Sequence, residues 1–157
     1  MRFFTARQLS SWSRRTPPKC ARVAKLTAGG FPWLVAEGDG RVTGYAYAGP
    51  YHDRPAYRWA LENSVYIAPD STRRGIGRAL LEALVAESES RGFRQMTAVI
   101  GDAANAASIG LHRACGFGHV GTLDAVGYKH GRWLSVVMMQ RALGPGSATN
   151  PSDHPAM

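Results

Sequence analysis

The first half of the chain contains short runs rich in apolar, aromatic and β-branched residues, and in one of them Tyr45 and Tyr47 alternate with small residues, as is typical of β-strands. Strands are predicted over residues 31–36, 42–49 and 59–68. The Asp39-Gly40 pair between the first two strands strongly indicates a two-residue hairpin turn. These signals predict neighbouring antiparallel strands.

The pattern then changes to that of an amphipathic helix. A helix is predicted to begin in the Arg73–Arg78 turn and to run to about Arg91, with Arg78 and Glu82 spaced to pair on its outer side. Its inner face is predicted to contain Ile76, Leu80, Ala83, Leu84 and Glu87. The remaining expected elements are a short helix ended by Gly29-Gly30, a helix over 105–114, and strands over 95–100, 119–125 and 134–140.

Composition limits these elements to one domain of ordinary size. The chain has 157 residues, of which 45% are hydrophobic and 19% are charged, so it can bury a core. We expect a basic, poorly ordered segment over 1–15, the folded domain over 16–142, and a flexible polar tail over 143–157. No apolar run approaches the roughly 20 residues that span a bilayer. The two cysteines favour a reduced, cytoplasmic protein.

The net charge of +8 is concentrated at the start of the chain. Residues 1–36 hold seven Lys and Arg and no acidic residue. A nucleic-acid groove needs basic residues spread over a folded face, so nucleic-acid binding is not the favoured interpretation. A basic, Ser-containing start also fits an organelle transit peptide or an ordinary exposed terminus.

A glycine-containing turn carries the first chemical signal. Arg73-Arg74-Gly75-Ile76-Gly77-Arg78 lies between a predicted strand and a helix, where backbone N–H groups and arginine side chains can bind a diphosphate. The turn lacks the third glycine of a dinucleotide-binding fingerprint and the Gly-Lys-Ser/Thr of a P-loop. By itself, a glycine-containing turn before a helix is more often architectural than a ligand site.

Several separated motifs together resemble the GNAT superfamily of N-acetyltransferases. They are the Val65-Tyr66-Ile67-Ala68-Pro69 strand, the Gly75-Ile76-Gly77 turn, Asn105, and the run from Leu111 to Phe117. Glu62-Asn63-Ser64-Val65-Tyr66 and Gly127-Tyr128-Lys129-His130-Gly131 look like the phosphinothricin and methionine sulfoximine acetyltransferase branch. The resemblance covers about residues 15–142 and implies a single α/β domain, with a mixed, mostly antiparallel sheet flanked by helices.

The resemblance implies acetyl-CoA as the acetyl donor, with no metal. The backbone of Val65, Tyr66 and Ile67 would bind the pantetheine arm, and the turn formed by Arg73, Arg74, Gly75, Ile76, Gly77 and Arg78 would bind the pyrophosphate. Asn105 would contact the pantetheine end, or act only as a helix N-cap. Thr72 stands where the family usually has Gln or Arg.

The same resemblance implies the catalytic residues. Glu62 would be the base that deprotonates the acceptor amine, although it could also be a strand carboxylate that points to solvent. His112, which replaces the usual tyrosine, would donate a proton to the departing thiolate, or be a structural histidine. Nothing pairs Cys115 with a base, so a cysteine nucleophile is not expected.

For the acceptor, the resemblance points to the segment between two predicted strands. Arg54 and Tyr57 match a substrate-binding Arg-x-x-Tyr, where the arginine would bind a carboxylate or phosphinate, or simply keep the loop soluble. Lys129 and His130 would complete this pocket or the pocket of a neighbouring subunit, because the family implies a homodimer.

One family feature is not visible at the start of the chain. The family normally begins with a strand and helix that wall the acceptor pocket, and residues 1–14 show no such pattern, so we expect both elements to be missing or replaced. The expected activity is acetyl transfer to the primary amine of a small amino acid or analogue, by direct attack in a ternary complex. The alternative is a non-catalytic acyl-CoA-binding module.

Overall fold

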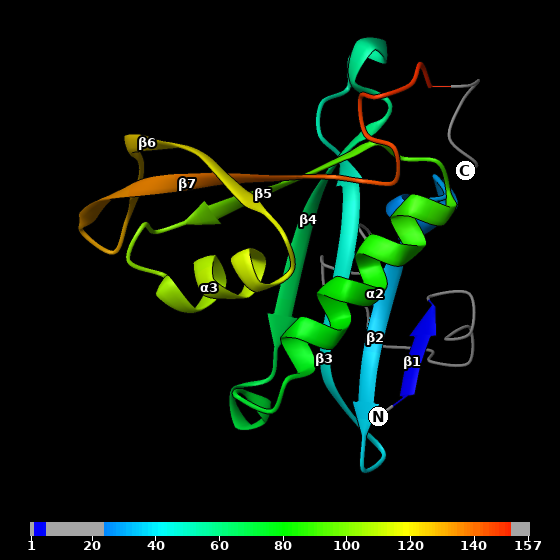
Figure 1. Ribbon diagram of the computed structural model, residues 1–157. Helices are drawn as coiled ribbons and strands as arrows, with labels where there is room; N and C mark the ends of the chain where they lie inside the picture. The colour runs from blue at the N-terminus through cyan, green and yellow to red at the C-terminus, as the bar shows by residue number, and fades with distance from the viewer. Residues whose placement is uncertain (1, 6–23, 152–157) are drawn as a thin grey trace.

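A seven-stranded sheet runs through the part of the chain that the computed structural model describes, residues 2–5 and 24–151 (Figure 1). Its strands are β1 (Arg2–Thr5), β2 (Trp33–Gly38), β3 (Arg41–Pro50), β4 (Ala60–Ile67), β5 (Gln95–Gly101), β6 (Gly118–Lys129) and β7 (Arg132–Ala142). They lie in the order β1-β2-β3-β4-β5-β7-β6, and only the β4–β5 pair is parallel. The expected mixed, mostly antiparallel sheet is confirmed.

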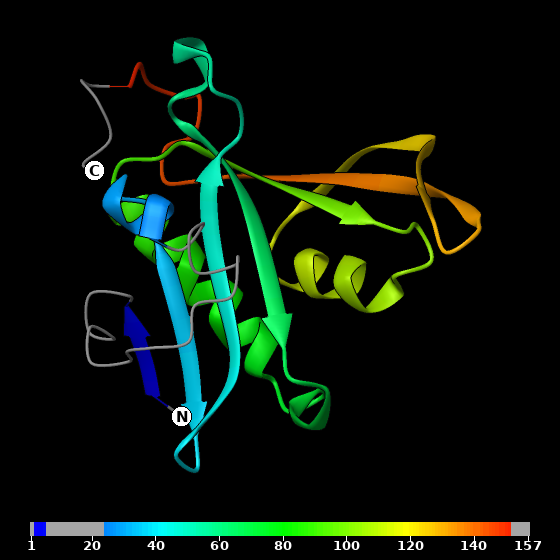
Figure 2. The same cartoon turned by 180° about the vertical axis from the view of Figure 1, so that it is seen from behind.

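Helix α2 (Ile76–Ser90) packs along one face of the sheet against β2, β3 and β4, and Figure 2 shows the opposite face. Helix α3 (Ala106–Ala114) follows β5, and two 3₁₀ turns, η2 (Pro55–Tyr57) and η3 (Pro69–Ser71), flank β4. Residues 24–28 form a short helix before Gly29 and Gly30, as predicted. No helix among the described residues is long and apolar enough to cross a membrane.

The buried side of α2 differs in detail from the predicted one. Its buried residues are Ile76, Leu80, Leu81, Leu84, Val85 and Ser88. Glu87, which was expected inside, instead pairs with Arg91. The predicted Arg78–Glu82 pair forms on the exposed side at 2.8 Å. The apolar stripe is thus rotated toward Leu81 and Val85, which lets the helix lie flat on three strands.

Two hairpin turns have the backbone that two-residue connections favour. Asp39 and Gly40 have φ values of 53° and 71°, and His130 and Gly131 have 53° and 76°. Positive φ at both central residues matches the right-handed twist of the paired strands. The first turn was predicted. The second makes β6 and β7 longer than the predicted 119–125 and 134–140, because only two residues separate the strands.

The ends of the chain also depart from expectation. Strand β1 pairs antiparallel with β2, from Arg2 opposite Glu37 to Thr5 opposite Leu34, where no strand was expected. An edge strand of four residues is too short to show a clear alternating pattern. The expectation that the first helix is missing or replaced concerns residues 6–23, which lie outside the described residues. Most of the expected 1–15 segment lies outside them as well.

At the other end, the predicted tail begins inside the core. Leu143 is fully buried, and its N–H donates to the carbonyl of Arg94 at 3.0 Å. The Arg94 guanidinium donates in turn to the carbonyls of Gly146 and Asn150. The tail is therefore attached to the start of β5 as far as Asn150, and residues 152–157 lie outside the described part.

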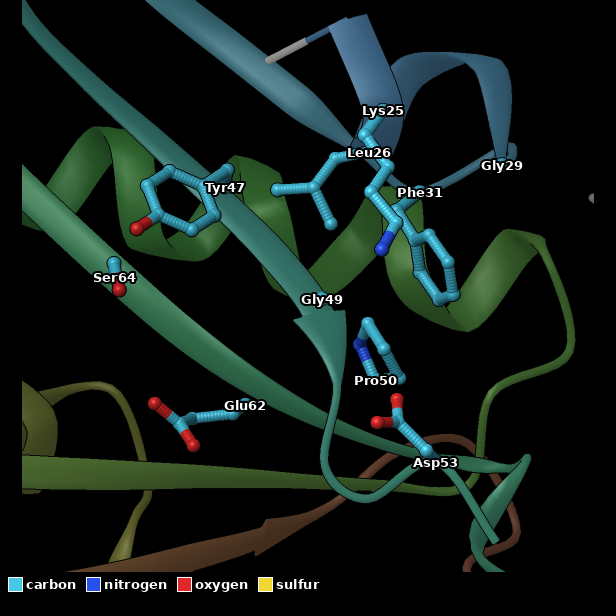
Figure 3. Close-up of a pocket in the computed structure, with 10 residues that line it drawn as sticks. All are labelled: Lys25, Leu26, Gly29, Phe31, Tyr47, Gly49, Pro50, Asp53, Glu62 and Ser64. Atoms are coloured by element: carbon cyan, nitrogen blue, oxygen red, sulfur yellow. The ribbon is translucent and has the colours of Figure 1, made fainter. Parts of the chain in front are cut away.

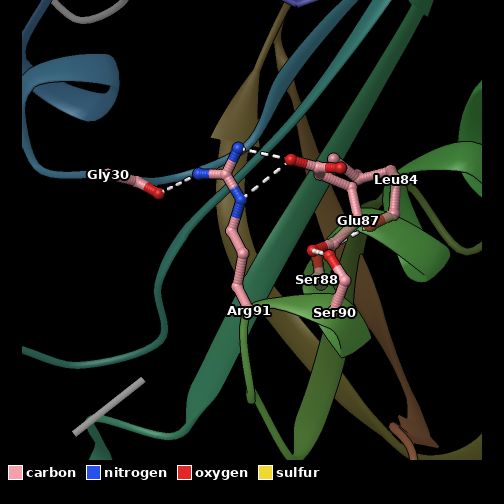
Figure 4. Close-up of polar contacts among 6 residues, drawn as sticks. All are labelled: Gly30, Leu84, Glu87, Ser88, Ser90 and Arg91. Atoms are coloured by element: carbon pink, nitrogen blue, oxygen red, sulfur yellow. Dashed lines mark hydrogen bonds and ion pairs between the residues drawn. The ribbon is translucent and has the colours of Figure 1, made fainter. Parts of the chain in front are cut away.

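Arg91 attaches the short helix and its glycine turn to the end of α2 (Figure 4). Its guanidinium donates to the carbonyl of Gly30, and its Nε donates to Glu87 Oε1 at 3.0 Å. Beside this contact, Phe31 stacks on Phe93 with ring centroids 6.0 Å apart. The turn before β2 is thus held by a charged contact and an apolar contact in addition to backbone hydrogen bonds such as Phe31 N–H to the carbonyl of Leu26 at 2.9 Å.

Candidate active site

The parallel pair β4–β5 separates halfway along its length. The strands pair from Ala60 opposite Gln95 to Asn63 opposite Ala98, and no further. Beyond that point β4 remains paired with β3 as far as Ile67, and β5 with β7 as far as Gly101. Figure 1 shows the two strands diverging, with α3 beside the opening. The divergence leaves an edge of β4 without a strand partner among the described residues.

A wedge-shaped cavity of about 460 Å³ occupies this opening, and the following residues line it: Asn63, Ser64, Val65, Tyr66, Ala98, Val99, Ile100, Gly101, Asn105, Ser108, His112 and Lys129. An open strand edge offers backbone N–H and C=O groups to an extended ligand. Val65 and Tyr66, which were predicted at the cofactor, line the wedge, and Ile67 follows them at the end of β4. The wedge thus fits a narrow, amide-bearing chain.

The predicted phosphate-binding turn caps the start of α2. Gly75 is the N-cap residue at φ 77° and provides no side chain to the helix, so the first N–H groups of α2 are not capped by it. Arg73 and Arg74 are exposed and have no hydrogen-bond partner among the described residues. A Cβ at Gly77 would lie 3.4 Å from Leu111 Cδ2, which places this turn beside α3. Amides and positive charge therefore lie together next to the helix that borders the wedge.

Asn105 is confirmed as a helix N-cap, and its contact with the pantetheine end remains a prediction. Its side-chain oxygen accepts a hydrogen bond from Ser108 N at 3.1 Å, which makes it the N-cap of α3. The same side chain lines the wedge. The cap interaction uses the oxygen, so the amide nitrogen remains for a ligand.

His112 lies at the inner end of the wedge and is only 4% exposed. Its Nδ1–H donates to the carbonyl of Ser108 at 2.8 Å, and its Nε2 lies 3.0 Å from Asn63 Oδ1. Asn63 Nδ2 donates to the carbonyl of Thr97 at 2.8 Å, across the last paired positions of β4 and β5. Burial lowers the pKa of His112, and the Ser108 carbonyl opposes this to a smaller extent. The histidine is tightly held.

A second cavity, of about 380 Å³, lies beside Glu62 (Figure 3). Its lining residues are Lys25, Leu26, Gly29, Phe31, Tyr47, Gly49, Pro50, Asp53, Glu62 and Ser64. Glu62 is half-buried and lies opposite Gly49 in the β3–β4 register, where no side chain covers its carboxylate. The cavity therefore combines carboxylates at Glu62 and Asp53 with the ammonium of Lys25, which Figure 3 shows pointing inward.

The structure does not bring all predicted acceptor residues together. Arg54 and Tyr57 do not line the second cavity, although their neighbour Asp53 does. Tyr57 packs edge-on against Tyr51, with ring centroids 5.9 Å apart. Lys129 lines the wedge instead. His130 lies in the β6–β7 turn.

Sequence reasoning missed many of the residues that line the cavities, among them Lys25, Asp53 and Ser64. Lys25 and Asp53 lie in a helix and a loop, whose approach to β4 depends on the tertiary fold. Ser64 could have been predicted, because it lies two positions after Glu62 in the same strand and its side chain therefore points to the same face of β4.

Two other kinds of chemistry find no support in the described part of the chain. No group of three or more His, Cys, Asp or Glu there is arranged to hold a metal ion. Cys115 is buried, and burial raises the pKa of its thiol, which disfavours the reactive thiolate. The cavities themselves are the candidate site.

Comparison with known proteins agrees with this geometry. Residues 2–117 match the model of the acetyltransferase (GNAT) family. The chain is 53% identical over 131 residues to phosphinothricin N-acetyltransferase from Alcaligenes faecalis, a match that covers 83% of this chain and 66% of that enzyme. It is 39% identical over 140 residues to the L-methionine sulfoximine/L-methionine sulfone acetyltransferase of Salmonella typhimurium, covering 87% and 81% of the two chains.

A solved structure shares the architecture as well. The phosphinothricin acetyltransferase of Sinorhizobium meliloti, crystallised in complex with acetyl-CoA, superposes with a TM-score of 0.84 at 46% identity, and the match covers 89% of this chain and 78% of that one. The family model spans most of the chain, and the structural match covers 89% of it. On these grounds the chain belongs to the acetyltransferase (GNAT) family.

Proposed function

We propose that this chain transfers the acetyl group of acetyl-CoA to the primary amine of a small amino acid or analogue, of the phosphinothricin or methionine sulfoximine type. The observation that carries the proposal is the pair of cavities that meet at the point where β4 and β5 separate. One cavity suits an extended thioester arm and the other suits a small charged acceptor. Both substrates can therefore be bound at once, which direct attack in a ternary complex requires.

The residues present fit acetyl-CoA. The free edge of β4 at Val65 and Tyr66 offers backbone groups to the pantetheine amides, and Asn105 offers its amide nitrogen. The start of α2 offers uncapped N–H groups and Arg74 to the pyrophosphate. Lys129 adds a positive charge to a wedge whose lining residues in the described chain include no carboxylate.

Glu62 is the proposed base. An amino acid arrives mostly as an ammonium ion and must lose a proton before its nitrogen can attack the thioester carbon. The half-buried Glu62 carboxylate faces the acceptor cavity and can take this proton directly or through water. A main-chain N–H of β4 would stabilise the oxyanion that forms on the thioester oxygen.

The acceptor cavity has the charges that recognise an amino acid. Asp53 and Glu62 attract its ammonium group, and Lys25 attracts its carboxylate or phosphinate. Arg54 and Tyr57 border this region in the loop after β3 and remain predicted contacts, as His130 does for a neighbouring subunit.

The test is acceptor-dependent thiol release from acetyl-CoA, measured with phosphinothricin, methionine sulfoximine and unrelated amines. We expect release with the first two, and a loss of about 10²- to 10⁴-fold in kcat/KM for Glu62→Gln. Full activity of Glu62→Gln from pH ~6 to ~9 would refute the role of Glu62 as base. Binding of acetyl-CoA without release by any amine would instead favour a non-catalytic binding module.

We also propose that the chain forms a homodimer and functions in the cytoplasm. The support for a dimer is a group of exposed apolar side chains on the long β6–β7 hairpin, here called the hairpin patch: Val120, Leu123, Val126, Tyr128 and Trp133. Several large apolar side chains exposed on one hairpin are the kind of surface that binds another protein. Cell fractionation that located the protein in an organelle would contradict the cytoplasmic assignment.

A further inference from the structure

The two cavities share one lining residue in the described part of the chain, Ser64. Glu62 lines only the acceptor cavity, and Asn63 and Val65 line only the wedge, because successive strand residues point to opposite faces. Ser64 is the first residue of β4 after the last β4–β5 pair, Asn63 opposite Ala98. At this position the sheet no longer separates its two faces, so one side chain can reach both cavities.

Among the described residues, the Ser64 hydroxyl has no interaction that would keep it from a ligand. It is half-buried, and it makes no hydrogen bond within the described residues. Two neighbouring polar side chains are committed to the backbone: Asn63 donates to the carbonyl of Thr97, and Thr97 Oγ1 donates to the carbonyl of Leu61 at 3.0 Å. Figure 3 shows Ser64 on the same side of β4 as Glu62. As far as the described residues show, its hydroxyl is available as donor and acceptor between the two cavities.

His112 is not free in this way. The proton on Nδ1 is donated to Ser108, and a second proton on Nε2 would point at Asn63 Oδ1. In either protonation state no ring N–H is directed into the wedge while these contacts persist. Direct protonation of the sulfur by His112 would therefore break a buried hydrogen bond, whereas Ser64 has none to break.

We propose that Ser64 is a further catalytic residue, which relays a proton from the acceptor nitrogen to the departing sulfur; this rests on the proposed function. Glu62 first takes one proton from the ammonium group. The amine nitrogen then forms a C–N bond to the thioester carbon, and the nitrogen of the tetrahedral intermediate keeps two protons and a positive charge.

The relay completes the transfer without another reactant. As the C–S bond breaks, the Ser64 O–H gives its proton to sulfur while Ser64 Oγ takes one proton from the nitrogen. The products are the amide and the thiol of CoA, and Ser64 ends in its starting form. In this scheme His112 and Asn63 are positioning residues that hold β4 at the last paired position.

The experiment compares Ser64→Ala with the hydroxyl-retaining Ser64→Thr. For Ser64→Ala we expect kcat with acetyl-CoA to fall about 10²-fold, while the KM of the acceptor and the calorimetric Kd of acetyl-CoA stay unchanged. Ser64→Thr should recover most of the lost kcat. Ser90→Ala is the control, because Ser90 is exposed at the end of α2 and its Oγ donates only to Glu87 O.

Three results would overturn the relay. Wild-type kcat in Ser64→Ala shows that no hydroxyl is needed, and equal losses in Ser64→Ala and Ser64→Thr show that the hydroxyl is not the cause. A weaker acetyl-CoA Kd in Ser64→Ala that accounts for the whole loss shows a binding role instead. In each case the wild type still acetylates its acceptor, so the proposed function stands. A wild type without acceptor-dependent thiol release overturns both.

Discussion

At the scale of single residues, the site depends on a glycine, which has no side chain, as well as on charged residues. Gly49 lies opposite Glu62, and a Cβ at position 49 would lie 3.0 Å from Leu26 Cδ2. The absent side chain lets Leu26 pack over β3 and leaves the Glu62 carboxylate open to the cavity. Gly29 and Phe31 also line this cavity, and their positions depend on how the chain before β2 is held.

Arg91 holds that wall from outside the cavity, through the carbonyl of Gly30. Arg91→Ala is expected to raise the KM of the acceptor several-fold and leave the KM of acetyl-CoA unchanged, because the Gly29–Phe31 segment loses its charged contact and keeps only its backbone hydrogen bonds and the Phe31–Phe93 contact. It should also lower the free energy of unfolding by about 1.5–3 kcal/mol, the usual contribution of hydrogen bonds to a charged group. Steady-state kinetics and urea unfolding measure the two effects.

Arg41→Ala is the matched control, since the Arg41–Asp70 pair is exposed, 3.5 Å long and joins the start of β3 to η3 and not to the glycine turn. We expect a change of at most about 1 kcal/mol there, with normal kinetics. An unchanged acceptor KM in Arg91→Ala would show that the glycine turn keeps its place without the arginine.

Local signals predicted these residues unevenly. The Arg78–Glu82 pair and the Asn105 cap followed from spacing within one helix, and both are confirmed. The positions of Lys25 and Asp53 could not be predicted from spacing, because each reaches the cavity only through packing between distant segments. The contact between His112 and Asn63 could not be predicted either, because these residues are 49 positions apart in the sequence.

At the scale of elements, the separation of β4 and β5 creates the wedge, and the β6–β7 hairpin extends beyond it. The sequence predicted these four strands but not where β4 and β5 part, which the register alone shows. It also predicted β6 and β7 too short, because the apolar residues of the hairpin patch are exposed and do not alternate with a buried face.

The hairpin patch predicts a dimer. Light scattering of the wild-type protein should give twice the mass of one 17.0 kDa chain. The double variant Val120→Lys/Trp133→Lys should shift the protein to monomer, because loss of a central aromatic contact costs about 2 kcal/mol or more and lysine adds charge repulsion. Val42→Lys, at an exposed position on β3, is the control. A monomeric wild type, or an unchanged dimer in the double variant, would contradict this interface.

At the scale of the whole molecule, the sequence motifs led to the correct family and to the order of the central elements. They succeeded because glycine turns, helix starts and strand runs are local. The first strand was missed because β1 is a short edge strand whose only partner is β2. The acceptor cavity was only partly predicted, because residues from the short helix, the loop after β3, and β4 converge on it.

The central claim is that the divergent sheet and the start of α2 bind acetyl-CoA. Isothermal titration calorimetry of the folded chain tests it most directly, with circular dichroism to verify the fold. We predict saturable binding of one acetyl-CoA per chain, weakened about tenfold or more in Arg73→Ala/Arg74→Ala through the loss of charge-assisted hydrogen bonds to the phosphates. Folded wild-type protein that gives no heat of binding with acetyl-CoA would contradict the account.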